Sequence, residues 1–243
     1  LDLSYDKMLK KNLKLVDRVH CISKEIKKDL IKLNFPKKKI LEIPNCIHFK
    51  KFNKYRSFRP KLLTLITVAR YAEKKKGFDF VEKIGRCLLK KIQFKWVIIG
   101  RNVSKLSKNE FISKHRKNFI LVEEINNDEL FFPNSKLIKY YKSSTIYAHL
   151  SRIESFGITI LEALTSGLPI ISFKSIGSET LIKNGVNGYL IKCYETNQYV
   201  KKIIKIYKSK NKLMKFNLND LTKYDLDFNA NKSIKDYKLL IRI

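Results

Sequence analysis

From Lys61 onward, short apolar runs alternate with segments whose apolar residues recur at helical spacing, and this alternation constrains the fold more than any other feature of the chain. Apolar runs between helices are typical of strands buried on both faces, as in a parallel sheet covered by helices. The pattern predicts strands at 62–69, 94–99, 119–122, 145–150, 169–173 and 188–191. It predicts helices at 78–91, 134–143, 157–166, 178–184 and 195–208. The expected fold class is α/β, with a doubly wound parallel sheet that binds ligands at the carboxyl ends of its strands.

The part of the chain before Lys61 is organised differently. Two short strands, at 18–22 and 40–43, are predicted on either side of a helix that Ser23 would cap. The basic segment 44–60 is interpreted as a linker. The divisions that the sequence predicts are 1–43, 44–60, 61–220 and a tail, 221–243, with a helix near 228–241.

Two glutamates, Glu154 and Glu162, lie eight positions apart across a loop that leads into a predicted helix. Gly157 allows the backbone between them to come close to a ligand. The free N–H groups of the first helical turn, from Phe156 to Thr159, favour an anion. A phosphate there would leave sugar hydroxyls within reach of both carboxylates, as a nucleotide-sugar requires. Two solvated glutamates on an ordinary amphipathic helix are the alternative interpretation.

The segment from Ser151 to Leu164 resembles the E-x7-E motif of retaining glycosyltransferases with the GT-B fold, of the glycosyltransferase family 4 or group 1 type. Ser166-Gly167-Leu168-Pro169 is similar to the small-Gly-x-Pro turn that follows the motif, and Ile43-Pro44-Asn45 to the family's domain junction. The resemblance covers residues 13–240 approximately. It implies that 61–220 is the Rossmann-like domain that binds the nucleotide-sugar donor. It also implies that 1–43 is the end, or remnant, of an N-terminal, acceptor-side Rossmann-like domain.

The same resemblance implies roles for single residues around the motif. Glu162 would bind the ribose hydroxyls of the nucleotide, and Glu154 would contact hydroxyls of the transferred sugar. Backbone amides of Phe156, Gly157 and Ile158 would assist at the sugar and the phosphates, and Thr159 would complete this donor-binding turn.

Arg70 follows the first predicted strand of this region, and Lys75-Lys76-Gly77 lies in the loop after it. They resemble the Arg/Lys pair that clamps the donor diphosphate in the family. Fixed cations can stabilise the charge that collects on a departing nucleoside diphosphate. Arg70 would hold two oxygens and a lysine would act as a point charge. Lys76 is preferred because it directly precedes Gly77, Lys75 is the alternative, and a solvated side chain is the ordinary interpretation of either lysine.

The function that the resemblance implies is hexosyl transfer from a UDP- or GDP-sugar to a saccharide or lipid-linked acceptor, with retention, in the biosynthesis of lipopolysaccharide, capsule or exopolysaccharide. Glu154, Arg70 and Lys76 would be the catalytic residues. No cofactor and no divalent metal are expected, because no Asp-x-Asp metal motif is identified and the loop cations would take the metal's place. Two alternatives stay open: a related GT-B epimerase or phosphorylase, and a truncated remnant, suggested by the initial Leu1, that binds nucleotide-sugar without catalysis.

The net charge of +30, from 52 Lys and Arg against 22 Asp and Glu, favours anionic partners. The basic runs are dispersed and form no Arg-rich or aromatic-basic block, so nucleic acid is not expected. The chain has no apolar run long enough to span a membrane, and its four cysteines form no C-x-x-C pair. We therefore expect a cytoplasmic protein with reduced thiols that is attracted to the anionic inner face of the cytoplasmic membrane. Compositional drift toward lysine is the alternative explanation of the charge.

Overall fold

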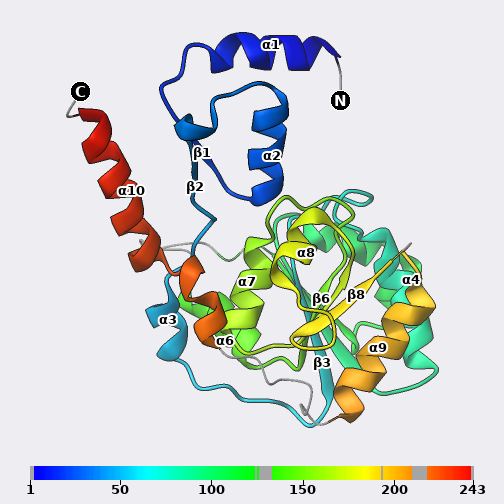
Figure 1. The fold of residues 1–243 in the computed structure, drawn as a ribbon. Coiled ribbons are helices and arrows are strands. Elements are labelled where there is room, and N and C mark those ends of the chain that lie inside the picture. The colour runs from blue at the N-terminus through cyan, green and yellow to red at the C-terminus, as the bar shows by residue number, and fades with distance from the viewer. Residues whose placement is uncertain (1–2, 124, 126–132, 193, 210–217, 242–243) are drawn as a thin grey trace. The chain divides into compact units, whose positions relative to one another are not determined.

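The computed structural model describes residues 3–123, 125, 133–192, 194–209 and 218–241, and it divides the chain into two compact units (Figure 1). The larger unit is Ile47–Asp225. The smaller unit combines Leu1–Cys46 with Leu226–Ile243.

The smaller unit is built around a pair of short parallel strands, β1 (Val19–Cys21) and β2 (Ile40–Glu42). Ser23 caps the helix between them by accepting a hydrogen bond from the Ile26 N–H at 3.3 Å, as expected from the sequence. The other elements of this unit are α1 (Leu3–Leu13), α2 (Lys24–Lys32), η1 (Lys37–Lys39) and α10 (Leu226–Ile241). Asp236 of α10 accepts from Arg18 at 3.2 Å and lies 3.0 Å from His20 Nε2, so it ties the tail helix to β1.

The larger unit contains a parallel sheet with the order β5-β4-β3-β6-β7-β8. Its strands are β3 (Leu63–Val68), β4 (Phe94–Ile99), β5 (Phe119–Val122), β6 (Ile146–His149), β7 (Ile170–Phe173) and β8 (Gly188–Ile191). The chain builds outward from β3 in one direction and then returns to build outward from β6 in the other. The neighbouring strands β3 and β6 therefore form the topological switch point, where doubly wound sheets bind their ligands.

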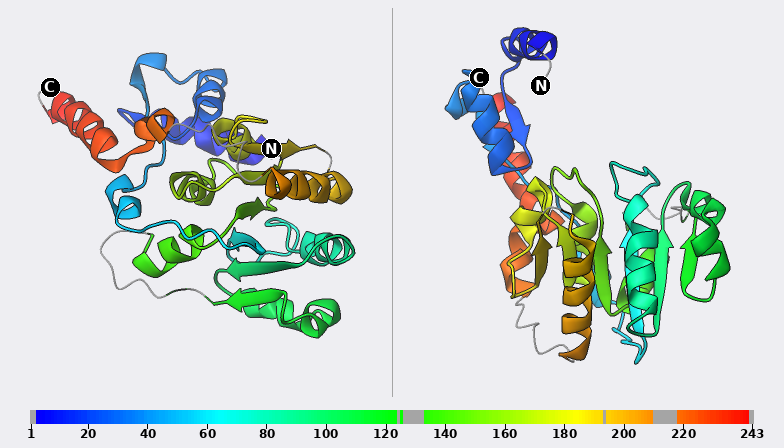
Figure 2. Two further views of the ribbon diagram at one scale, coloured as in Figure 1. Left: turned by 90° about the horizontal axis from the view of Figure 1, so that it is seen from below. Right: turned by 90° about the vertical axis from the view of Figure 1, so that its right-hand side faces the viewer.

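Helices cover both faces of this sheet (Figure 2). Its helices and 3-10 turns are α3 (Phe49–Asn53), α4 (Asp79–Leu89), η2 (Val103–Lys108), α5 (Glu110–Lys114), α6 (Ser135–Lys142), α7 (Ile158–Thr165), α8 (Ile176–Leu181), α9 (Thr196–Lys208) and η3 (Leu218–Tyr224). α4 and α9 pack side by side on one face, and α6 and α7 lie together on the other. The strands are almost completely buried, and Trp96, Phe94 and Phe173 are among the largest fully buried side chains.

The predicted α/β class and doubly wound parallel sheet are confirmed, and each predicted strand of this region has its counterpart within one residue at either end. Two short helices, α3 and α5, were not predicted, and α3 lies inside the segment interpreted as a linker. The helix predicted at 178–184 is displaced to Ile176–Leu181. Ser175 and Ser178 form a reciprocal capping box there, which begins the helix two residues early.

Among the helices of the described chain, none is both long enough and apolar enough to cross a membrane.

Candidate functional site

The predicted site residues of the larger unit gather where the loops after β3 and β6 meet. Gly77, at the end of the first loop, has φ +71°, and a Cβ atom at this position would lie 2.1 Å from the carbonyl oxygen of Leu150. Only glycine lets the two backbones approach so closely. The loop that carries Lys75 and Lys76 is thus packed directly on the end of β6.

Arg152 fastens these two loops together. Its guanidinium donates to both carboxylate oxygens of Asp79 at 2.6 Å and to the carbonyl of Lys74 at 2.5 Å. Its backbone N–H donates to the carbonyl of Lys75 at 3.1 Å, and its guanidinium carbon lies 4.1 Å from the centre of the Phe80 ring. A bidentate ion pair of this kind fixes the orientation of the guanidinium as well as its distance from the carboxylate. Arg152 therefore holds the lysine-bearing loop in place.

The Lys76 ammonium contacts the Glu154 carboxylate at 2.8 Å. Both side chains are only 19% exposed, so this pair is sheltered from solvent more than a surface ion pair. The structure thus brings together two of the predicted catalytic residues, which lie 78 positions apart in the sequence.

Arg70 and Lys75 are exposed. Arg70 lies two residues beyond the carboxyl end of β3. Within the described part of the chain, no hydrogen bond or ion pair holds either side chain. Both cations are therefore available to an anionic ligand.

The loop from Glu154 leads into α7 through Gly157, whose φ of +88° belongs to the left-handed region. Ile158, 41% exposed, and Thr159 form the first turn of the helix. The Thr159 hydroxyl lies 2.7 Å from that of Tyr147. The Phe156 ring is buried against Tyr224. Phe156 can consequently offer a ligand its backbone but not its ring.

α8 packs against the backbone of this loop. The Gly177 N–H donates to the Glu154 carbonyl at 2.7 Å, and a Cβ on Gly177 would lie within 2.8 Å of the Phe156 backbone. The backbone that presents the Glu154 carboxylate is therefore fixed on two sides.

Glu162 is completely buried inside α7. The Tyr141 hydroxyl donates to one of its carboxylate oxygens at 2.7 Å, and the other oxygen, Oε1, has no hydrogen-bond partner. Burial raises the pKa of Glu162 to about 7, and the hydrogen bond from Tyr141 opposes this shift. Glu162 is thus a carboxyl group close to half-protonated at neutral pH, with one oxygen still able to accept a hydrogen bond or hold the proton.

His149, at the end of β6, is buried next to the ion pair. Burial lowers its pKa to about 4, while the Glu154 carboxylate raises it and the Lys76 ammonium lowers it. The imidazole is accordingly neutral at physiological pH, and its Nε2 atom has no hydrogen-bond partner. A neutral, buried imidazole therefore lies next to the Lys76–Glu154 ion pair.

Sequence reasoning missed Arg152, Asp79, Tyr141 and His149. Arg152 lies inside the motif but its partner is 73 positions away, and Tyr141 is 21 positions from Glu162. No local spacing could have paired them.

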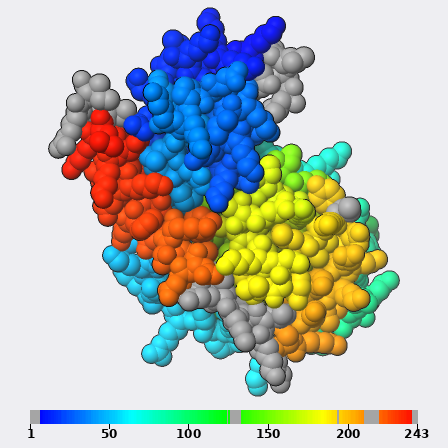
Figure 3. All heavy atoms as spheres, viewed as in Figure 1, coloured from blue at the N-terminus to red at the C-terminus, as the bar shows by residue number. Residues whose placement is uncertain are grey.

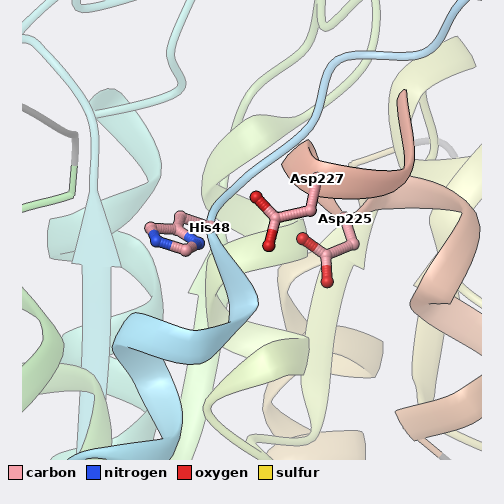
Figure 4. Close-up of side chains that lie close together, drawn as sticks. All are labelled: His48, Asp225 and Asp227. Atoms are coloured by element: carbon pink, nitrogen blue, oxygen red, sulfur yellow. The ribbon is translucent and has the colours of Figure 1, made fainter. Parts of the chain in front are cut away.

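A separate group of acidic residues lies outside this site. Asp225-Leu226-Asp227 has the Asp-x-Asp spacing of some metal sites, so the expectation that the chain lacks such a motif was wrong. The Ile47 N–H donates to the Tyr224 carbonyl at 3.1 Å, which brings His48 close to Asp225, and Figure 4 shows these two side chains with Asp227. None of the three is without an interaction partner, and we assign no metal to them.

Known proteins resemble this chain both in sequence and in fold. The model of the family described as Glycosyl transferases group 1 matches residues 49–220, more than half of the chain. An uncharacterized glycosyltransferase of Haemophilus influenzae is 30% identical over 125 residues, which are 50% of this chain and 33% of that protein. The GtfA subunit of a UDP-N-acetylglucosamine–peptide N-acetylglucosaminyltransferase from Streptococcus agalactiae is 30% identical over 132 residues, which are 54% of this chain and 24% of that protein. The matched region thus spans between a quarter and a third of these relatives.

Solved structures agree with the fold. A glycosyltransferase from Rickettsia africae ESF-5 superposes with a TM-score of 0.80 at 17% identity, over 99% of this chain and 68% of that one. The lipopolysaccharide outer core galactosyltransferase WaaB superposes with a TM-score of 0.68 at 19% identity, over 91% of this chain and 62% of that one. Anabaena HepE, solved in complex with UDP, gives a TM-score of 0.65 at 14% identity, over 94% of this chain and 68% of that one. At these identities the likeness establishes a shared fold.

Proposed function

Because the chain belongs to the family Glycosyl transferases group 1, we propose that its larger unit binds the nucleotide-sugar donor of a glycosyl transfer reaction. The observation that carries this proposal is the position of Arg70, Lys76 and Glu154 at the switch point between β3 and β6. Ligands of doubly wound sheets bind there, outside the carboxyl ends of the strands.

The charges at this edge suit a diphosphate that carries a sugar. Arg70 and Lys75 are exposed cations without an ion pair to any described residue, so they would contact the phosphates first. Lys76 is paired with Glu154. When the ligand binds, two contacts would replace this ion pair. The Lys76 ammonium would contact a phosphate, and the Glu154 carboxylate would accept hydrogen bonds from sugar hydroxyls.

Stabilisation of the leaving group would follow from the same contacts. As the bond from the anomeric carbon to the phosphate breaks, negative charge grows on the phosphate oxygens. The fixed cations Arg70 and Lys76 then interact more strongly with the transition state than with the ground state. In this proposal no divalent metal is needed for departure of the nucleoside diphosphate.

The proposed ribose contact of Glu162 agrees with its free Oε1 atom but requires access to a fully buried group. Tyr141 holds the other oxygen, so a ribose hydroxyl would have to reach Oε1 at the inner side of α7. Backbone N–H groups of Phe156, Gly157 and Ile158 would complete the donor contacts at the helix start, with Thr159 in the same turn.

A UDP-sugar is the preferred donor in this proposal, since the Streptococcus relative is named for UDP-N-acetylglucosamine and HepE was solved with UDP. A GDP-sugar is the alternative. Four parts of the proposal rest on the motif resemblance. They are hexosyl transfer with retention, membership of glycosyltransferase family 4, a saccharide or lipid-linked acceptor, and a role in cell-surface polysaccharide. Attraction to an anionic membrane is also part of the proposal and rests on the charge of +30.

Titration calorimetry with UDP, uridine and a panel of UDP- and GDP-sugars tests donor binding. Arg70→Gln should weaken UDP much more than uridine, because it removes a charged contact to phosphate, by about 1.5–3 kcal/mol. Glu154→Gln should weaken the sugar-bearing donor and leave free UDP unchanged or tighter. Equal losses for UDP and uridine in the Arg70 variant would show that Arg70 does not hold phosphate.

Turnover assays separate the remaining alternatives. Release of UDP and a new glycosidic product only when an acceptor is present supports transfer, whereas turnover without acceptor indicates an epimerase. Donor binding without any turnover by the natural full-length protein would support a remnant that binds but does not catalyse.

A further inference from the structure

At the amino ends of its strands, the sheet of the larger unit borders a cavity of about 610 Å³ that the proposed donor site does not use. It opens where β3 and β6 begin and where α9 ends. Its lining includes Arg59, Pro60, Lys61, Ile146, Tyr207 and Lys208. α9 itself reaches the surface of the unit, in gold and orange in Figure 3.

Arg59 is the unusual residue of this cavity. Its Nη2 atom donates to the carbonyl of Gly167, just after the end of α7. Its Nη1 atom is buried and has no hydrogen-bond partner. A guanidinium donor left without an acceptor is costly, and a bound anion would remove that cost.

The charges around Arg59 are of one sign. Lys61 and Lys208 line the cavity, and none of its lining residues in the described part of the chain is acidic. Lys142 lies near Arg59, and burial lowers its pKa, with the positive charge of Arg59 as the second cause. Burial also lowers the pKa of Arg59 itself. Within the described chain, none of these four residues forms an ion pair with a carboxylate.

Helix ends at this edge offset part of the charge but not all of it. The carboxyl ends of α6, α7 and α9 lie here, since α6 ends at Lys142 itself, and each is equivalent to about half a negative charge. Four cations against three half-charges leave a positive excess among the residues that the structure describes. The structural role of Arg59 as a cap for α7 accounts for Nη2 and leaves Nη1 unexplained.

From these observations we propose that this cavity binds a phosphate-bearing molecule with an apolar portion. The phosphate would bind beside the exposed Lys61 and Lys208, and the Arg59 guanidinium would turn so that its buried Nη1 donor faces the cavity and donates to the phosphate. Pro60, Ile146 and the ring of Tyr207 form an apolar wall for the rest of the ligand. A soluble phosphate ester and a phospholipid headgroup share this chemistry, and the site does not depend on the proposed donor binding.

Lysine footprinting tests the location of binding. The full chain is acetylated with and without a probe, either inorganic pyrophosphate or dihexanoyl phosphatidic acid, and modification of each lysine is followed by mass spectrometry. Protection of Lys61 and Lys208, with Lys201 on the same helix unaffected, is the expected result. Protection by pyrophosphate alone supports a soluble ester, and protection by the lipid alone supports a headgroup. No protection by either probe, or equal protection of Lys201, overturns the proposal.

Variants test the residues. Arg59→Gln should weaken the protecting probe about tenfold or more, as for loss of a charged hydrogen bond. If that variant does not fold, the double variant Lys61→Gln with Lys208→Gln replaces it, since both side chains are exposed. It should weaken binding of the probe to a similar extent, at about fivefold for each charge. Lys201→Gln is the matched control and should bind normally. Unchanged affinity in the lysine pair, or a loss that appears only in Arg70→Gln, would show that the probe binds elsewhere.

Discussion

Glu162 is a carboxyl group in a place where a negative charge is costly. Its folded pKa of about 7 lies above the ordinary value of 4.5, so the folded state binds its proton more tightly than the unfolded state. Protonated Glu162 therefore contributes to the free energy of unfolding. This stabilising contribution is fully present below pH 4.5 and is lost as the pH rises through 7.

Glu162→Gln should remove this dependence while keeping an acceptor for Tyr141. At pH 8 we expect the free energy of unfolding of the variant to exceed that of the wild type by about 3 kcal/mol, and at pH 4.5 the two should agree. Urea unfolding followed by circular dichroism across this pH range measures the difference. His149, which titrates at lower pH, is common to both proteins and cancels. A constant difference at every pH would show that Glu162 does not titrate as the structure indicates.

Arg152 acts on the site through its neighbours. Arg152→Lys keeps a positive charge but loses the two-pronged contact with Asp79, and we expect the free energy of unfolding to fall by about 1–2 kcal/mol. Acetylation of Lys76 should become faster relative to Lys75, because the loop is no longer fastened. Arg101→Lys, at an exposed position, is the control and should change neither quantity. Lost stability with unchanged Lys76 reactivity would make Arg152 a purely structural residue.

At the scale of elements, the turn before α4 depends on Gly77. Gly77→Ala adds both a strained φ and a collision with the Leu150 backbone, whereas Gly185→Ala, at φ +81° with no atom within 4 Å of the new Cβ, adds strain alone. Gly185→Ala should cost about 1–2 kcal/mol of unfolding free energy, and Gly77→Ala should cost clearly more. Thermal unfolding of the two variants gives the comparison. Equal losses would mean that the loop after β3 moves away from β6 easily.

The strands and helices also differ in how well they could be predicted from the sequence. Strands of the parallel sheet are buried on both faces, so each appears as an apolar run with clear ends, as Phe94–Ile99 does. α3 and α5 have five residues each, too few turns for a helical period. The paired contacts of the site join residues far apart in sequence, such as Lys76 with Glu154. The motif placed Glu162 on α7, but its burial depends on packing against other elements.

At the scale of the whole molecule, the two units differ in the size of their cores. The principal apolar cluster of the larger unit runs from Leu63 to Ile206, whereas that of the smaller unit has only Cys21, Leu30, Phe35 and Ile40 as its buried members. We expect amide hydrogens of β1 and β2 to exchange with solvent by lower-energy openings than those of β3 and β6. Native-state hydrogen exchange with mass spectrometry measures this, and equal protection of both strand pairs would contradict it.

The seam between β3 and β6 also has a consequence for the order of folding. Its buried hydrogen bond from the Thr67 hydroxyl to the Ala148 carbonyl joins residues 81 positions apart, whereas neighbouring strands within each half of the sheet are linked by shorter crossovers. Closing the longer loop costs more chain entropy, so each half can form before the seam closes. Arg70 and Glu154 lie on opposite sides of that seam. If the halves form first, the candidate site is completed only when the seam closes, and a chain stalled before that step would have most of its secondary structure and none of its site.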